Sequence, residues 1–199
     1  MKTLYIFRHG ETDWNRSFRF QGSTDIPLND TGRAQALVLR EFFRENPVEA
    51  FFSSDLHRAR ETAEIARGET KVPIIVDSRL RETNLGLAEG LTHEEVQRQF
   101  GDLAKSWSSA SKEDWHVAFP EGESKFQHLA RLLDGLKDLL TRHPYEKVGV
   151  ASHGGAIRRL IHHMRPELSE PVMIANCVLY EMHFDETKGL HILDLKPRR

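Results

Sequence analysis

The sequence has one cysteine, no long apolar run and almost no excess of charge of either sign. Cys177 can close no internal disulfide, which suits a reducing compartment. Near the N-terminus only the apolar stretch Leu4 to Phe7 precedes Arg8, too short for the apolar region of a signal peptide or for a membrane span. We therefore expect a cytoplasmic protein with no membrane partner.

The charges of the chain nearly cancel. Lys and Arg number 28 and Asp and Glu 30, for a net charge of −2, so no overall field attracts nucleic acid or an anionic membrane. Any anionic ligand has to be held by a local group of charges. The 199 residues, 39% of them hydrophobic, are typical of a globular protein, and we expect one domain over residues 1–199.

Short apolar runs that favour β-structure divide the chain at residues 4–7, 50–53, 74–76 and 148–151. Helical apolar spacing marks residues 31–43, 59–66, 92–101, 124–141 and 157–164. Strands that alternate with helices predict an α/β fold, a three-layer αβα sandwich around a mostly parallel sheet. Two further runs, 177–184 and 190–195, are joined by a polar turn and predict an antiparallel edge strand.

Residues 102–123 interrupt this alternation. Trp107, Trp115 and Phe119 lie there among serine, lysine and aspartate without a sustained period. We interpret the segment as an ordered insertion, and our hypothesis is that it covers the substrate and sets specificity, although the tryptophans could equally serve packing. The helix that follows begins near Ser124, and its apolar stripe, which includes Phe126, should face the core.

Charged side chains follow the predicted parallel strands at their carboxyl ends, the edge where open parallel sheets bind ligands. The segments are 8–12, 54–60, 81–82 and 152–155, and they contribute two histidines, several arginines and one glutamate. Arginines and the glycines at a helix start suit phosphate oxygens. A histidine beside guanidinium groups should have a lowered pKa and act as a neutral nucleophile, while a second histidine stabilises developing charge and a glutamate protonates the leaving group.

Other phosphate chemistries lack their patterns. The chain has no Asp-x-Asp pair and no Walker-type glycine loop, and Cys177 is followed six positions later by His183 rather than by arginine. His93 begins the spacing of a zinc protease, but position 97 is glutamine. His162 and His163 have no third ligand in register, so we expect them on a helix surface. No metal site is predicted.

Ordered motifs extend from Leu4 to about Asn176. They are 7–12 with Asn15, 19–22, 27–32, 53–59 with 62–63, 80–82 with Gly86 and 89–90, 122–124, and 152–155. Together these motifs resemble those of the histidine phosphatase superfamily, in the branch that contains cofactor-dependent phosphoglycerate mutases and related phosphatases. The resemblance covers nearly the whole chain.

The resemblance implies that His9 is the nucleophile and forms a phosphohistidine. It implies that Arg8, Arg58 and His153 bind the phosphoryl group and that Glu82 serves as acid and then as base, although Glu82 could merely pair with Arg81. The implied substrate-binding residues are Asn15, Gln21, Gly22 and Gly154. The family needs no metal or other cofactor, and the implied partner is a small phosphorylated substrate; the oligomeric state stays open.

The segment after Glu82 favours one branch of the family. Residues 83–90 lack the tyrosine-glycine stretch expected of mutases, and the chain is short, so we predict a phosphatase of small phosphomonoesters. A cofactor-dependent phosphoglycerate mutase is the alternative. A non-catalytic module that binds phosphorylated ligands is the third possibility, but both His9 and Glu82 are present.

Overall fold

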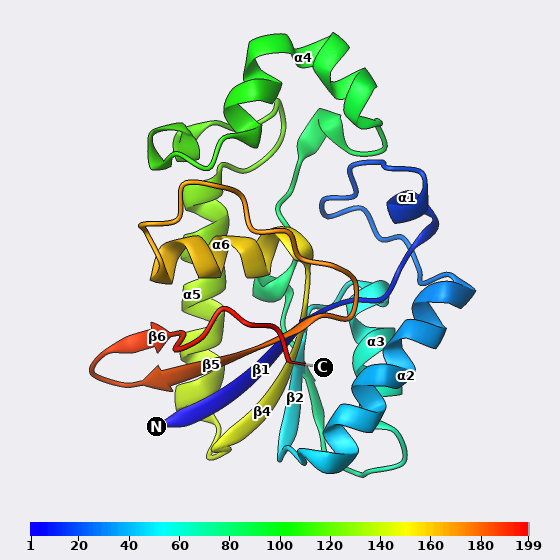
Figure 1. The fold of residues 1–199 in the computed structure, drawn as a ribbon, viewed down its shortest axis with the longest axis vertical. Helices are drawn as coiled ribbons and strands as arrows, with labels where there is room; N and C mark the ends of the chain where they lie inside the picture. The colour runs from blue at the N-terminus through cyan, green and yellow to red at the C-terminus, as the bar shows by residue number, and fades with distance from the viewer. Residues whose placement is uncertain (199) are drawn as a thin grey trace.

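A computed structural model describes residues 1–198 and contains a six-stranded sheet in the order β3-β2-β4-β1-β5-β6 (Figure 1). The strands are β1 Lys2–Arg8, β2 Ala50–Ser53, β3 Ile74–Val76, β4 Lys147–Ser152, β5 Leu179–Asp185 and β6 Gly189–His191. Strands β1 to β4 pair in parallel, whereas β5 is antiparallel to β1 and β6 is antiparallel to β5. The mostly parallel sheet with an antiparallel edge is confirmed, although β6 ends at His191 and not at residue 195.

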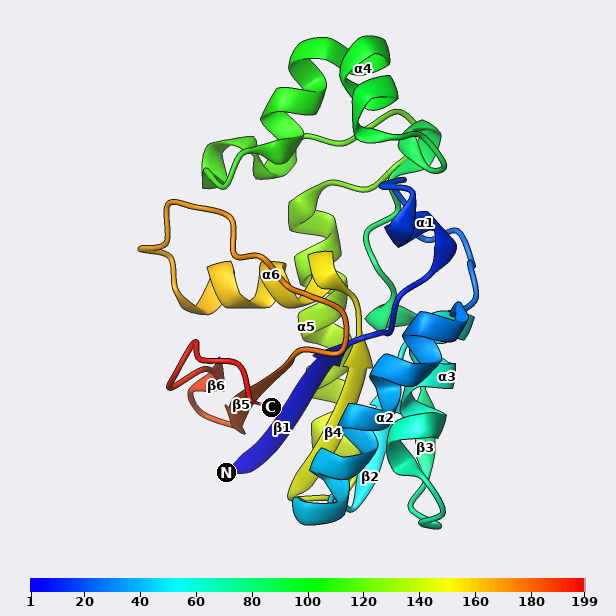
Figure 2. The same ribbon diagram turned by 45° about the vertical axis from the view of Figure 1, so that its right-hand side comes forward.

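Helices cover both faces of the sheet (Figures 1 and 2). The helices are α1 Asp13–Arg16, α2 Asp30–Glu45, α3 His57–Arg67, α4 His93–Ser108, α5 Lys125–Arg142 and α6 Gly154–Met164. One core cluster packs α2 and α3 against β1 and β2, and a second packs α5 and α6 against β1 and β4. This is the predicted three-layer sandwich. None of the helices in residues 1–198 is long and apolar enough to cross a membrane.

The register of the central strands determines which residues meet at the carboxyl edge of the sheet. Arg8 of β1 lies beside Ser152 of β4, and the backbone N–H of His9 donates to the carbonyl of Ser152 at 3.0 Å. Both strands are buried on both faces, so a shift of register would expose apolar side chains. His9 and His153, one residue beyond each strand, are therefore brought to the same place.

Helix α5 keeps its predicted apolar stripe except at its start. Of the predicted stripe, Leu129, Leu136 and Leu140 are buried and Leu133 is half-buried, but Phe126 is 49% exposed, so its predicted burial is wrong. Lys125 stands four residues before Leu129 and so continues the stripe, and it is 3% exposed. The first turn of α5 thus points a lysine inward and turns the phenylalanine outward.

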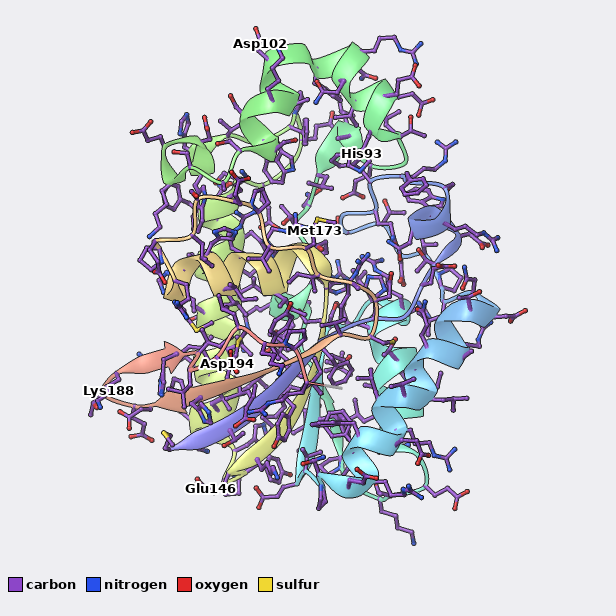
Figure 3. All side chains as sticks on the ribbon, in the orientation of Figure 1. His93, Asp102, Glu146, Met173, Lys188 and Asp194 are labelled. Carbon is purple, nitrogen blue, oxygen red and sulfur yellow. The ribbon has the colours of Figure 1, made fainter. Side chains whose placement is uncertain are left out.

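Residues 102–123 are more regular than the sequence indicates. Helix α4 is kinked at Gly101, where the backbone is not helical and φ is positive (49°), and its second part ends at Ser108; a 3₁₀ helix follows at Lys112–His116. The kink changes the direction in which the apolar side chains of the helix point. No single helical spacing of apolar residues therefore covers this part of the sequence. Figures 1 and 3 show α4, with His93 and Asp102, at the end of the molecule farthest from Glu146. It lies beyond the carboxyl edge of the sheet.

Candidate active site

His9 follows β1 and is 3% exposed. Its Nδ1 lies 2.7 Å from the carbonyl oxygen of Gly10. A carbonyl can only accept, so Nδ1 carries the ring proton and Nε2 keeps its lone pair. Burial lowers the pKa of His9 well below its usual value, and the charges of Arg58 and Arg8 lower it further. The ring is therefore neutral at neutral pH and has a free nitrogen.

His153 follows β4, and its ring centre lies 5.3 Å from that of His9. The side chain is fully buried, and within residues 1–198 neither ring nitrogen has a hydrogen-bond partner. Burial, followed by the charge of Arg58, lowers the pKa of His153 well below its usual value. A buried imidazole without partners costs free energy unless a ligand supplies them.

Arg58 lies in the first turn of α3 and is fully buried. Its two terminal nitrogens donate to the carbonyls of Gly22 and Thr24, each at 2.7 Å, while Nε has no partner within residues 1–198. Burial lowers the pKa of Arg58 to about 10, so the group is still a cation at neutral pH. Its neighbours His57 and Arg60 are exposed, and Arg58 alone of the three turns inward.

Arg8 is the last residue of β1, and a different part of the chain from the one that holds Arg58 anchors its side chain. Its Nη1 donates to the carbonyl of Ile174 at 2.6 Å, and Nε again has no partner among the described residues. That Nε would lie 3.2 Å from a Cβ added to Gly154, at the start of α6. The glycine therefore lets the guanidinium approach the N-terminus of the helix, where backbone N–H groups favour anions.

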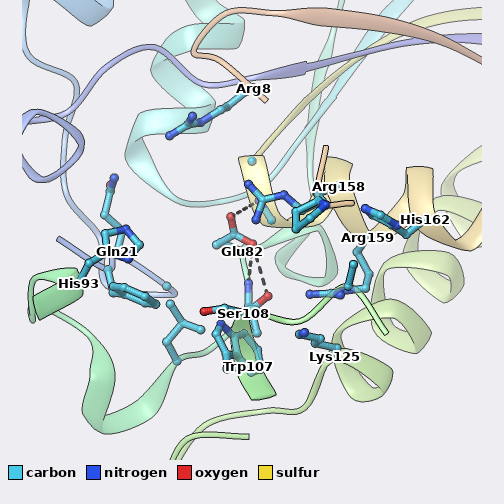
Figure 4. A pocket seen from close by; sticks show the side chains of 18 of the residues that line it. Arg8, Gln21, Glu82, His93, Trp107, Ser108, Lys125, Arg158, Arg159 and His162 are labelled. Atoms are coloured by element: carbon cyan, nitrogen blue, oxygen red, sulfur yellow. Dashed lines mark hydrogen bonds between the residues drawn. The ribbon is translucent and has the colours of Figure 1, made fainter. Parts of the chain in front are cut away.

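Glu82 reaches the site from the loop that follows β3. Its Oε2 accepts from the N–H of Gly155 at 2.7 Å and its Oε1 from the N–H of Thr83 at 2.9 Å. Arg81 pairs instead with Asp55, at 2.6 Å, so Glu82 is not merely its ion-pair partner. The carboxylate faces the cavity (Figure 4).

A cavity of about 310 Å³ joins these groups. The predicted site residues that line it are Arg8, His9, Asn15, Gln21, Gly22, Glu82 and Gly154. Arg58 and His153 are buried beside His9, and all nine predicted residues therefore come together. Residues 1–198 hold no group of three or more His, Cys, Asp or Glu side chains placed to bind a metal.

One supporting residue was not predicted. Glu89 accepts the backbone N–H groups of Ser23, Thr24 and Leu85 at 2.8, 2.9 and 3.0 Å. It thereby holds the loop whose carbonyls anchor Arg58. Its position in a family motif, next to Gly90, was the only indication in the sequence.

A group of cations at the cavity was also not predicted from the sequence. Lys125, Arg158 and Arg159 line the cavity together with His162, which is 5% exposed. The expectation that His162 lies on a helix surface is wrong, because α6 packs on both the core and the cavity; His163 is exposed as expected. Trp107 and Trp115 line the same cavity.

Comparison with known proteins identifies the family of the chain. Residues 4–193 match the family described as the histidine phosphatase superfamily (branch 1). The chain is 35% identical over 87% of its length to phosphoglycerate mutase-like protein 4 of Arabidopsis thaliana, of which 75% is covered. It is 32% identical over 94% of its length to the uncharacterized phosphatase PhoE of Bacillus subtilis (strain 168), of which 91% is covered.

Among solved structures, Bacillus stearothermophilus YhfR superposes with a TM-score of 0.87 and 30% identity. The match covers 98% of this chain and 96% of that one. The family match spans nearly all of the sequence, as the motifs indicated. The chain belongs to the histidine phosphatase superfamily, and its relatives include phosphoglycerate mutase-like proteins.

Proposed function

We propose that the protein is a phosphatase that hydrolyses small phosphomonoesters through a phosphohistidine on His9, in a cytoplasmic setting and without a metal. The observation that carries this proposal is the free Nε2 of a neutral His9 next to buried donors that have no hydrogen-bond partner in the described part of the chain. Those donors belong to Arg8, Arg58 and His153.

A phosphoryl group would satisfy these donors. The Nε atoms of Arg8 and Arg58 and a ring nitrogen of His153 are unpartnered within residues 1–198, and each buried orphan costs about 1–3 kcal/mol. Three non-bridging phosphoryl oxygens can accept from all of them, and the N-terminus of α6 adds backbone donors. Charge that develops on these oxygens during transfer is stabilised without rearrangement of the protein.

The reaction then needs two transfers. In the first, Nε2 of His9 attacks phosphorus, the bond to the ester oxygen breaks, and Glu82 gives its proton to the departing alkoxide. In the second, water attacks the phosphohistidine and Glu82 accepts a proton from it, which frees His9 and inorganic phosphate. The proton that Glu82 gives to the alkoxide in the first transfer is replaced by the proton it takes from water in the second, so the cycle balances.

Two features favour hydrolysis over mutase chemistry. The loop 83–90 lacks the tyrosine-glycine stretch expected of mutases and packs as a 3₁₀ helix at Gly86–Ala88. The relative PhoE, which covers nearly the whole chain, is named a phosphatase. We propose that residues 102–123 cover the substrate within the single domain, since residues 107–110 and Trp115 line the cavity.

Hydrolysis of 4-nitrophenyl phosphate in excess chelator tests the proposal. The wild type should turn over and His9→Ala should not, with His57→Ala as a control histidine on the surface. Equal rates for wild type and His9→Ala contradict catalysis by His9, and a wild-type rate no higher than that of uncatalysed hydrolysis favours a binding module. Isomerisation of phosphoglycerate that depends on added bisphosphoglycerate identifies a mutase instead.

The role of residues 102–123 has a separate test. Exchange of this segment for the corresponding segment of PhoE should change the relative kcat/KM values among phosphomonoesters. Unchanged ratios in a folded chimaera reject the substrate cover.

A further inference from the structure

A second group of cations faces the cavity beyond the residues that phosphoryl transfer uses. We propose that Lys125 and Arg159 form a second anion-binding subsite, so that the substrate is a phosphomonoester with a carboxylate or a second phosphate at its other end. This inference rests on the proposed phosphatase function and names the class of its substrate. No part of the transfer reaction described above employs either cation.

Lys125 is placed inward by the helix that carries it. It begins α5 in line with the apolar stripe and is 3% exposed, and its Nζ donates to the carbonyl of Ser109 at 2.6 Å. Nζ also lies 5.4 Å from the ring centre of Trp107. An ammonium group has three N–H donors, so the carbonyl leaves two of them for a ligand.

Arg159 projects from α6 towards the same part of the cavity. Figure 4 shows its nitrogens and Nζ of Lys125 turned to the space beside Trp107 and Ser108. The side chain is 7% exposed, its guanidinium carbon lies 4.9 Å from the ring centre of Trp115, and its Nε has no partner within residues 1–198. The aromatic ring attracts the cation but offers no hydrogen-bond acceptor for its N–H groups.

Neither cation has an ion-pair partner within the described part of the chain. Of the half-buried carboxylates nearby, Glu123 pairs with Arg131, Glu82 accepts backbone N–H groups, and Asp114 acts on Lys125 by its charge alone. Burial and the neighbouring Arg159 lower the pKa of Lys125 to about 8, and burial lowers that of Arg159 to about 10. Burial of two unpaired like charges opposes folding, and such arrangements are typical of ligand sites.

The helix that connects the two subsites sets the length of the substrate. Gly155 lies at the phosphoryl end of α6, and Arg159 is four residues further, which is about 6 Å along the helix axis. Arg158 adds positive charge, but its Nε is committed to the carbonyl of Val172 at 2.9 Å. A single small molecule can therefore place its phosphate against His9 and its second anion between Lys125 and Arg159.

Matched substrates test the subsite. A series of ω-phosphooxy carboxylates with about two to five methylene groups, spanning the helical separation, is compared with the ω-phosphooxy alcohols of equal length. Alkanediol bisphosphates form a third arm that distinguishes phosphate from carboxylate. In the wild type at least one anionic member should exceed its neutral partner by about 10- to 100-fold in kcat/KM, as expected for charge-assisted hydrogen bonds.

Variants assign that preference to the cations. Lys125→Met and Arg159→Gln should each reduce the ratio of anionic to neutral substrate about tenfold or more, whereas Lys125→Arg should largely retain it. Lys137→Gln, on the exposed side of α5, is the control and should leave both substrates unchanged. A wild-type ratio near one for both anion classes, or a ratio that Lys125→Met and Arg159→Gln leave unaltered, overturns the proposal.

The phosphatase assignment and the anion subsite can fail independently, and different measurements test them. If the wild type hydrolyses no phosphomonoester, 4-nitrophenyl phosphate included, the phosphatase assignment fails. Calorimetric binding of the same carboxylate and alcohol pairs then decides on the subsite: tighter binding of the carboxylate, lost in Lys125→Met, supports it, and equal binding rejects it.

Discussion

The N–H of Gly155 donates to Oε2 of Glu82 at 2.7 Å, and a Cβ added to Gly155 would lie only 2.4 Å from Oε1 of the same carboxylate. The glycine therefore both binds Glu82 and leaves room for it. Gly155→Ala should displace the carboxylate and reduce kcat/KM for alkyl phosphates by about 10²-fold or more, as loss of a general acid does. The reduction of kcat/KM should be smaller for 4-nitrophenyl phosphate, because its leaving group needs less protonation.

Glu82→Gln separates this effect from simple misfolding. By itself it should lower the rate with alkyl phosphates by about 10²- to 10⁴-fold. Addition of Gly155→Ala should then cost little more, because both changes act on one group. Additive losses, or equal losses on both classes of leaving group, contradict the positioning role of Gly155.

The protonation of the histidines can be observed directly. In ¹⁵N spectra recorded near pH 6.5, about the usual pKa of histidine, His9 and His153 should be neutral, with the proton of His9 on Nδ1. His57 is the internal control, since its hydrogen bond to Asp25 raises its pKa and it should be largely protonated there. Protonation of His9 at this pH, or a proton on its Nε2, would be incompatible with a nucleophile.

Glu89 supports Arg58 through the loop between them. Glu89→Gln turns an NH₂ group towards backbone donors, so the free energy of unfolding should fall by about 1–3 kcal/mol. The carbonyls of Gly22 and Thr24 hold the guanidinium of Arg58. Loosening of these carbonyls should misplace Arg58 in the phosphoryl site and lower kcat/KM about tenfold. Urea unfolding and steady-state kinetics measure the two effects. A variant as stable and active as exposed Glu94→Gln contradicts the role of Glu89.

The anion preference should depend on pH in a defined direction. Lys125 loses its proton as pH rises through its pKa of about 8, while Arg159, with a pKa of about 10, stays charged for longer. Asp114 and Arg158 are the other charged groups that act on Lys125. The ratio of carboxylate to alcohol substrate should therefore fall several-fold between about pH 7 and 9. Lys125→Arg should abolish that fall, and a flat wild-type profile contradicts the assignment.

Much of the site follows from local pattern. The apolar runs of β1 and β4 are short and end at charged residues, and their parallel pairing brings His9 and His153 to one edge. The N-cap at Ser124 likewise places the start of α5 correctly. Such features depend on neighbours in the sequence, which is why they can be predicted.

The supporting groups depend on tertiary contacts instead. Lys125 and Phe126 are adjacent, and only the packing of α5 beside the cavity decides that the lysine is the buried one. Glu89 acts on a loop more than sixty residues earlier in the chain. The kink at Gly101 turns the insertion in a direction that apolar spacing cannot indicate.

The covalent intermediate is the most direct test of the account. Rapid acid-free quenching during turnover of a ³²P-labelled phosphomonoester, followed by digestion and mass spectrometry, should locate an acid-labile phosphoryl group on His9. The label should be absent from His9→Ala. A phosphoryl group on another residue, or steady turnover by His9→Ala, would contradict the mechanism.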